Sequence, residues 1–271
     1  MFPVPVNLSP SRVDSFLTCP LAFRFSSIEK LPEPPSPHTT KGSLVHRALE
    51  LLFALPAAER TLEAADIAYA QAADEYRTHA DFTGLGLDAA AADEFFADGL
   101  VLTRKYFDIE DPSAIEAVGL ELWLEAPIGD VTIRGIIDRL ERDADGRLVI
   151  TDYKTGKAPS ASQQNDRFSA LHFYAYLCEQ QYGERPSTIR LMYLRSGTVL
   201  TASPTDTSMR LITNRATAVH RAIALSCESG QFATRKSGLC SWCSFQEWCP
   251  EFGGDPDLAK VEAPKRYGTA P

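Results

Sequence analysis

One β-rich segment near the middle of the chain constrains the fold more than any other. Val131–Ile137 is rich in β-branched residues, Asp143–Gly146 has the composition of a tight turn, and Leu148–Ile150 is apolar again. Two such runs joined by a turn favour a β-hairpin. In this hairpin Asp138 on the first strand comes to lie beside Asp152 on the second.

Lys154 is expected on the same face as these two carboxylates. Successive side chains of a strand point to opposite faces, so Asp152 and Lys154, two residues apart, share a face. Two carboxylates and an amine at a strand end suit a divalent metal ion and a developing negative charge. The simpler interpretation is a surface hairpin with scattered charges, because an isolated Asp-x-Lys is common. The flanking Gly135-Ile136-Ile137 and Thr155-Gly156 favour a functional site instead.

The composition is that of a globular protein. Of the 271 residues, 44% are hydrophobic and 23% are charged, which is enough for one large core. No apolar run could span a bilayer and no export signal opens the chain, so we expect a cytoplasmic protein with reduced thiols. The net charge of −9 argues mildly against general nucleic-acid binding, although a local basic groove would be sufficient for it.

The order of predicted elements is that of an α/β protein. Helices come first, three strands follow, and a helix, a strand and a long helix complete the core. The helices are expected from Ser9, over 44–53, in two or more Ala-rich stretches within 59–108, over 168–182 and over 206–228. The strands are expected at about 116–126, 131–140, 147–153 and 188–194.

The hairpin resembles the nuclease domain of the RecB-like branch of the PD-(D/E)xK superfamily. In that family the first Asp precedes Arg in a Gly-x-x-Asp-Arg strand, as Asp138 does, and the second opens Asp-Tyr-Lys-Thr-Gly, as Asp152 does. The resemblance implies a restriction-endonuclease-like α/β core, in which helices flank a central mixed sheet. It also implies a single nuclease domain over 1–271, with a helical insertion at 59–108 and the catalytic sheet at 116–200.

His46 is a further candidate ligand. It shares a helical face with Leu49 and Phe53, which points it inward, where a core histidine is the simpler explanation. However, the segment 42–46 resembles the helix that delivers a metal-binding His in RecB-like nucleases. Histidine suits Mn²⁺ as well as Mg²⁺, although Mg²⁺ prefers oxygen.

The resemblance also implies a metal site and a mechanism. The metal would lower the pKa of a water and polarise the scissile phosphate, while Lys154 would orient the water or stabilise negative charge. Glu121, in the strand before the hairpin, is either an auxiliary contact or a solvent-facing residue. The implied ligands of Mg²⁺ or Mn²⁺ are His46, Asp138, Asp152 and the backbone carbonyl of Tyr153.

The helix after the lysine departs from the family pattern Gln-x-x-x-Tyr. Tyr174 occupies the Tyr position, as an auxiliary site residue or a core aromatic, but Ala170 occupies the Gln position. Gln163, Gln164 and His172 lack the required spacing. Because the Gln is expected to contact DNA, its absence casts doubt on DNA positioning more than on metal binding. The candidate phosphate contacts are Arg139, Lys157 and Arg167.

A cysteine constellation closes the chain. The spacing Cys-x2-Cys-x5-Cys is formed by Cys240, Cys243 and Cys249. A tetrahedral or cubane centre needs one more thiolate. Cys19 is the best candidate, since Cys178 and Cys227 lie on predicted helices among apolar neighbours.

A zinc ribbon would bring two Cys-x2-Cys knuckles, whereas this chain has one. A lone distal cysteine with a C-terminal trio resembles the iron–sulfur staple of AddB-type and CRISPR-adaptation nucleases. The resemblance therefore implies a [4Fe–4S] cluster that ties Cys19 to 240–249, with zinc or no metal as the alternatives.

The function implied is that of a metal-dependent deoxyribonuclease acting on single-stranded DNA or DNA ends in repair, recombination or defence. A helicase or another repair protein is a further expected partner. The alternatives are a non-catalytic iron–sulfur DNA-binding subunit and a zinc-stabilised interaction protein. The intact Asp138, Asp152 and Lys154 argue against a non-catalytic subunit, while Ala170 and the acidic charge argue weakly for one.

Overall fold

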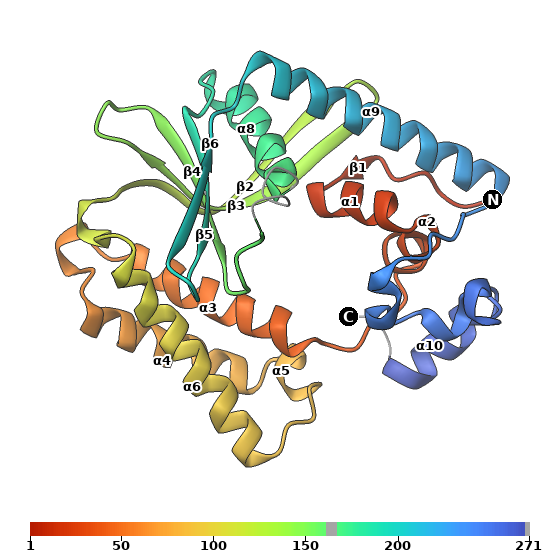
Figure 1. The fold of residues 1–271 in the computed structure, drawn as a ribbon, viewed down its shortest axis with the longest axis horizontal. Coiled ribbons are helices and arrows are strands. Elements are labelled where there is room, and N and C mark those ends of the chain that lie inside the picture. The colour runs from red at the N-terminus through yellow and green to blue at the C-terminus, as the bar shows by residue number, and fades with distance from the viewer. Residues whose placement is uncertain (161–166, 269–271) are drawn as a thin grey trace. The chain divides into compact units, whose positions relative to one another are not determined.

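The protein, described by a computed structural model for residues 1–160 and 167–268, forms two compact units (Figure 1). One unit combines Met1–Pro34, Glu125–Arg134 and the chain from Arg210 onward, and the other combines Pro35–Leu124 and Gly135–Met209. The sequence predicts one nuclease domain over 1–271, and this remains a prediction alongside the two compact units. Within the described ranges, no helix is both long and apolar enough to cross a membrane.

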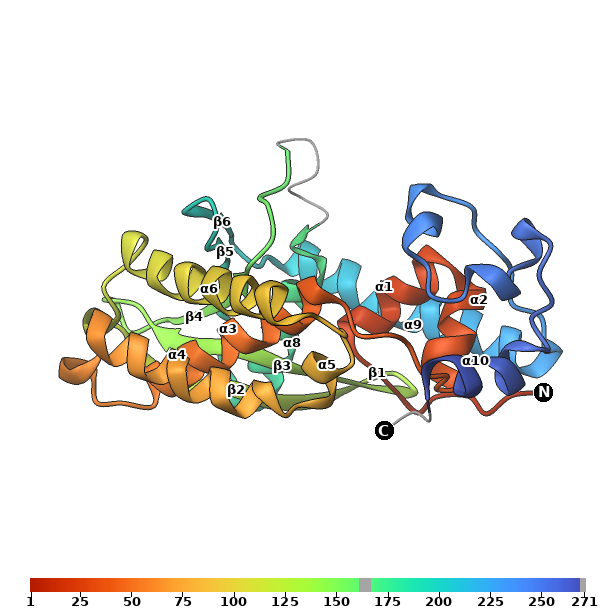
Figure 2. The same cartoon turned by 90° about the horizontal axis from the view of Figure 1, so that it is seen from below.

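The second unit contains most of the sheet and a group of packed helices. Helices α3, α4 and α6 lie side by side (Figure 2), and α8 packs against β4 and β5. The helices are α3 (Pro37–Phe53), α4 (Leu62–Arg77), α5 (Ala80–Thr83), α6 (Ala89–Lys105) and α8 (Ser169–Tyr182). The strands are β2 (Glu116–Ile128), β3 (Val131–Arg142), β4 (Leu148–Lys154), β5 (Thr188–Tyr193) and β6 (Thr198–Ala202), with the ends of β2 and β3 contributing to the first unit.

Local sequence fixes the ends of the helices. The side chain of Thr61 accepts a hydrogen bond from the Ala64 N–H at the start of α4, and Asp88 caps α6 through Ala91 in the same way. Such caps satisfy backbone donors that have no partner within the helix. Helix α3 begins at Pro37, seven residues before the expected segment, because proline fits the first turn of a helix.

The sheet is mixed, as the family resemblance implies. Strand β4 is antiparallel to β3 and parallel to β5, and β5 is antiparallel to β6. The β3–β4 turn is held by Asp143, whose carboxylate accepts from the N–H groups of Asp145 at 3.0 Å and Arg147 at 2.9 Å. Gly146 adopts φ +77°, which glycine reaches without steric cost. Strand β6 was not expected from the sequence.

The core of this unit joins the helices to the strand that carries Asp152. Apolar residues of α3, including Leu49 and Leu52, pack with Leu102 of α6, Tyr153 of β4 and Met192 of β5. These side chains are buried, and each large aliphatic one contributes roughly 1.5–3 kcal/mol relative to exposure. This packing places the middle of α3 against the end of β4.

The first unit gathers segments from both ends of the chain. Strand β1 pairs in parallel with the start of β3, and a small core forms around Phe25, Phe245 and Trp248. The described elements are β1 (Asn7–Leu8), α1 (Pro10–Thr18), α2 (Pro20–Phe23), the π-helix η1 (Arg24–Ile28), α9 (Asp206–Ser229, whose first turn belongs to the other unit), the 3₁₀ turns η6 (Gly238–Trp242), η7 (Gln246–Trp248) and η8 (Pro250–Phe252), and α10 (Ala259–Tyr267).

Candidate active site

The site forms where β3 and β4 separate. The last paired residues are Arg139 and Thr151, and the next pair in this register would be Asp138 and Asp152. Beyond that point the backbone N–H of Tyr153 donates to the Asp138 Oδ2 at 2.7 Å, in place of a strand carbonyl. Asp138 therefore satisfies a backbone donor in the gap between the strands, as buried polar groups require. The hairpin prediction that brings the two aspartates together is confirmed.

His46 reaches the same point from α3. Its Nε2 lies 3.0 Å from the backbone carbonyl oxygen of Tyr153, and its Nδ1 lies 3.6 Å from the Asp138 Oδ2. A carbonyl can only accept, so a hydrogen bond there places the imidazole proton on Nε2. The lone pair of Nδ1 then faces the carboxylates. The peptide of Tyr153 thus contacts Asp138 through its N–H and His46 through its carbonyl.

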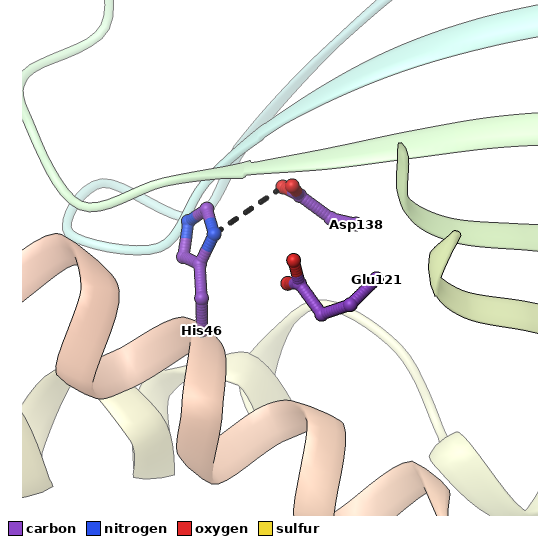
Figure 3. Close-up of side chains that lie close together, drawn as sticks. All are labelled: His46, Glu121 and Asp138. Carbon is purple, nitrogen blue, oxygen red and sulfur yellow. Dashed lines mark ion pairs between the residues drawn. The ribbon is translucent and has the colours of Figure 1, made fainter. Parts of the chain in front are cut away.

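Glu121 completes a three-residue group with His46 and Asp138 (Figure 3). One ligand atom from each lies within 4.8 Å of the other two, and within the described residues no other such group of three occurs. Strand β2 changes phase near Glu121: Glu116 and Val118 are exposed before it, and Trp123 after it. A one-residue slip in alternation is the mark of a bulge, and Glu121 has φ +42°, which is uncommon for a non-glycine residue.

Asp152 and Lys154 share a face of β4, as expected, and form an ion pair. Asp152 is buried, whereas the Lys154 side chain is about 43% exposed, so its amine remains accessible. Burial would lower the pKa of Lys154, but the charges of Asp152 and Asp138 outweigh that effect and raise it. Lys154 is therefore a positive charge at neutral pH.

Burial and mutual repulsion shift the carboxyl groups away from their ordinary behaviour. Burial, followed by the charge of Asp152, raises the pKa of Asp138 to about 6. Burial, followed by the charge of Asp138, raises the pKa of Glu121 to about 7. Carboxylates crowded in this way favour a bound cation, because a cation removes the repulsion that the protons otherwise relieve.

Tyr174 of α8 borders the same group. Burial, and then the charges of Asp152, Asp138 and Glu121, raise the pKa of its hydroxyl, which stays protonated. Its ring lies against Gly135, where a Cβ atom would approach the ring to 2.5 Å. The glycine of the Gly-x-x-Asp-Arg strand therefore makes room for the tyrosine.

Arg139 is not placed to contact DNA, so that prediction is wrong. Its side chain is 0% exposed and forms ion pairs with Glu110, at 2.6 Å, and with Glu141. It also donates to the hydroxyl of Tyr153 at 2.8 Å. Strand alternation explains the difference, because neighbours in a strand face opposite sides and Asp138 faces the metal-ligand group. Arg139 is a structural residue on the other face of the sheet.

The remaining DNA-contact candidates have mixed outcomes. Lys157 and Arg167 are exposed and stay predictions. His172 donates from Nδ1 to the Phe168 carbonyl at 2.8 Å, so its ring is engaged with its own helix. Gln163 and Gln164 lie outside the described residues.

The four candidate cluster cysteines surround one cavity in the first unit. Cys19, Cys240, Cys243 and Cys249 all line a cavity of about 90 Å³. Burial, opposed in part by a hydrogen bond from the Phe245 N–H, raises the pKa of the Cys243 thiol, and the other three cysteines raise it further. The ligand atoms of His46, Glu121 and Asp138 lie within 4.8 Å of one another. Among the described residues, no three of the cysteine sulfur atoms lie that close together. Cys178 and Cys227 are buried elsewhere.

The donor set in the second unit fits a hard divalent cation. An imidazole, two carboxylates and a backbone carbonyl suit Mg²⁺ or Mn²⁺. An adjacent ammonium can stabilise negative charge at a phosphate. The arrangement is therefore suited to metal-assisted phosphodiester chemistry.

Comparison with known proteins gives one family. The sequence matches the family described as the PD-(D/E)XK nuclease superfamily over residues 7–250. Among solved structures, the crystal structure of SSO0001 is similar with 15% sequence identity and a TM-score of 0.42, covering 93% of this chain and 89% of that chain. No curated protein matches at a significant level.

Proposed function

Because the chain belongs to the PD-(D/E)XK nuclease superfamily, we propose that it is a metal-dependent deoxyribonuclease of the RecB-like branch. Its substrate is single-stranded DNA or a DNA end, and its product is a hydrolysed phosphodiester. The single observation that carries the proposal is the convergence of His46, Glu121 and Asp138 beside the Asp152–Lys154 pair.

His46, Asp138 and the carbonyl of Tyr153 would hold the metal ion, with Asp152 and Glu121 completing its shell. A bound Mg²⁺ or Mn²⁺ would polarise the scissile phosphate and lower the pKa of the attacking water.

Lys154 supplies the positive charge of the reaction. Its accessible amine, held by Asp152, can approach a phosphate and stabilise the negative charge that develops as water attacks. Tyr174, protonated beside the carboxylates, can donate a hydrogen bond to a phosphate oxygen or to the attacking water. These two groups would act on the substrate, whereas His46 and Asp138 would hold the ion.

The test is cleavage of end-labelled DNA by protein purified without oxygen. Single- and double-stranded oligonucleotides, labelled at either end, are incubated with Mg²⁺ or Mn²⁺. Asp152→Ala and Lys154→Ala should abolish cleavage, while Asp145→Ala, in the exposed hairpin turn, should leave it unchanged. A wild-type protein that cuts no DNA with either ion would refute the proposal and support a non-catalytic DNA-binding subunit.

We also propose that the four-cysteine cavity holds a [4Fe–4S] cluster. Thiolates are the ligands of iron–sulfur centres, and four of them line this one cavity. A zinc ion held by the same thiolates is the alternative. Its role would be to tie Cys19 to the C-terminal loop.

A further inference from the structure

A second cavity, of about 590 Å³, lies in the first unit and carries a concentration of positive charge. It is bounded by the N-terminal segment, helix α1, the π-helix η1 and one residue of β3. Its charged lining residues are Arg12, Lys30 and Arg134, and among the described residues no Asp or Glu lines it. The chain has a net charge of −9, so this cavity is a local region of positive charge in a negatively charged protein.

Arg12 carries a partly buried charge that neutral groups hold in place. Its guanidinium donates to the carbonyl oxygen of Ser27 at 2.8 Å, to that of Asn7 at 3.2 Å and to the Asn7 side-chain oxygen at 3.4 Å. The described contacts of Arg12 include no carboxylate. Burial, and then the charge of Arg134, lower the pKa of Arg12. An anion in the cavity would offset both effects on Arg12.

Lys30 stands at the rim in a strained conformation. Its side chain is exposed and makes no hydrogen bond or ion pair in the parts of the chain described. Its backbone has φ +52°, in the region that favours glycine, so the fold holds a cationic residue where glycine would fit with less strain.

The walls of the cavity are fixed before any ligand arrives. The carbonyl oxygen of Pro5 accepts from the His220 Nε2 at 3.0 Å, and that of Val6 accepts from the Thr132 N–H at 3.1 Å. Pro3 and Pro5 restrict the backbone of the same wall. A preformed wall lowers the entropic cost of binding.

We propose that this cavity binds a phosphate and its adjoining sugar within a single nucleic-acid strand, separate from the phosphate that is cleaved. The proposal rests on the proposed nuclease function, which makes a DNA strand the anion that the protein meets. The guanidinium of Arg12 and the ammonium of Lys30 match phosphate oxygens, and a cavity of about 590 Å³ is of the size that accommodates a nucleotide. Arg12 and Lys30 would contact the strand outside the reaction centre.

The experiment measures binding rather than cleavage. Asp152→Ala protein is titrated into a fluorescent single-stranded oligonucleotide at several salt concentrations without divalent metal, and anisotropy gives the affinity. Lys30→Gly removes the amine and relieves the backbone strain, so its fold is retained. Lys260→Ala, at an exposed position of α10, is the control with the same change in charge.

We expect Lys30→Gly to weaken binding several-fold and to reduce the slope of log affinity against log salt by about 0.7, the value for one lost contact to single-stranded DNA. Arg12→Gln should do the same, with its thermal unfolding measured alongside. Lys260→Ala should change neither quantity. Equal affinities and slopes for Lys30→Gly, Arg12→Gln and Lys260→Ala would overturn the proposal.

A second arm distinguishes a strand from a free phosphate compound. Inorganic phosphate and a deoxynucleoside monophosphate are titrated by calorimetry into the wild type and Lys30→Gly. The proposal is supported if both small anions bind weakly while the oligonucleotide binds tightly and loses affinity in Lys30→Gly. Tight binding of either small anion, with strand affinity unaffected by Lys30→Gly, would overturn it. Because cleavage is not measured, the proposed nuclease function can fail independently.

Discussion

The carboxylate of Asp138 accepts a hydrogen bond from the backbone N–H of Tyr153 at 2.7 Å. This bond closes the gap where β3 and β4 part, and it fixes the orientation of the carboxylate toward His46. One side chain therefore satisfies a backbone donor and, in the proposed site, would also bind a metal ion. The two tasks can be separated by substitution.

Asp138→Asn should keep the fold and lose the metal. An asparagine oxygen can still accept from the Tyr153 N–H, but the negative charge is gone. We expect Mn²⁺ affinity, measured by calorimetry, to fall roughly tenfold or more. Asp138→Ala should lose the hydrogen bond as well and unfold at a lower denaturant concentration. An Asn variant with wild-type affinity would exclude Asp138 as a ligand.

Metal binding should depend on pH through the raised carboxyl pKa values. Below about pH 6 the Asp138 and Glu121 carboxyls hold protons, which the ion must displace, so affinity should rise as pH increases from 5 to 8. Calorimetry in buffers of different ionisation enthalpy should detect proton release near pH 6.5. Binding that is independent of pH across this range would contradict the assignment of the two ligands.

The same groups predict the stability of the metal-free protein. The folded state binds more protons than the unfolded state between about pH 4 and 7, because the folded carboxyl pKa values are raised. Their contribution to the free energy of unfolding should therefore decrease as pH rises through this window. Mn²⁺ should raise the thermal midpoint more at pH 8 than at pH 5, and Glu121→Gln should reduce that difference.

Arg139 should matter for stability and not for DNA affinity. Arg139→Met leaves Glu110 and Glu141 with Arg190 as their remaining ion-pair partner, and breaking this buried network costs up to about 3–5 kcal/mol of unfolding free energy. Urea unfolding measures the loss. Lys157→Ala, at an exposed position, should change stability by less than about 0.5 kcal/mol and is the matched control. If Arg139→Met is as stable as the wild type, the buried network contributes nothing.

Gly135→Ala tests the contact with Tyr174. An added Cβ would lie 2.5 Å from the ring, and overpacking of this kind costs about 1–3 kcal/mol. Gly156→Ala, whose Cβ would meet nothing within 4 Å, should be tolerated. The double variant Gly135→Ala with Tyr174→Ala should lose less unfolding free energy than the sum of the losses in the two single variants, because the clash is gone. Strict additivity in that cycle would argue against the contact.

The cysteines divide into two sets with different expected behaviour. Protein purified without oxygen should contain about four iron atoms per chain. Each of four single variants should lose this iron: Cys19→Ser, Cys240→Ser, Cys243→Ser and Cys249→Ser. Cys178→Ser and Cys227→Ser should keep it, since both thiols are buried away from the cavity. One zinc and no iron in the wild type would replace the iron–sulfur assignment and leave the nuclease proposal intact.

The sequence predicts the parts of the site that depend on local pattern. The alternation of β4 places Asp152 and Lys154 on one face, and the turn at Asp143–Gly146 sets Asp138 beside Asp152. The same alternation, applied one residue further, would have turned Arg139 away from the metal-ligand group. Strand alternation alone therefore places Arg139 on the face of the sheet opposite Asp138.

Other features depend on packing that no local pattern contains. The contact between His46 and the Tyr153 carbonyl joins residues 107 positions apart through the core of α3 and β4. The position of Glu121 follows from a phase slip in β2, which the sequence of a β-rich strand does not reveal. The short strand β6 follows the turn at Gly197, whose φ of +67° marks the reversal.

The composition of the first unit has a consequence for synthesis. Its segment Met1–Pro34 can pair with β3 early, but it meets its remaining partners only after the chain from Arg210 onward is made, whereas the second unit can close once Met209 has emerged. At about 5–20 residues per second, the last segment requires on the order of 3–12 s. During that interval Leu21 and Phe25, buried in the finished protein, lack their C-terminal cover. The nascent chain therefore exposes apolar side chains of Met1–Pro34 that a chaperone can bind.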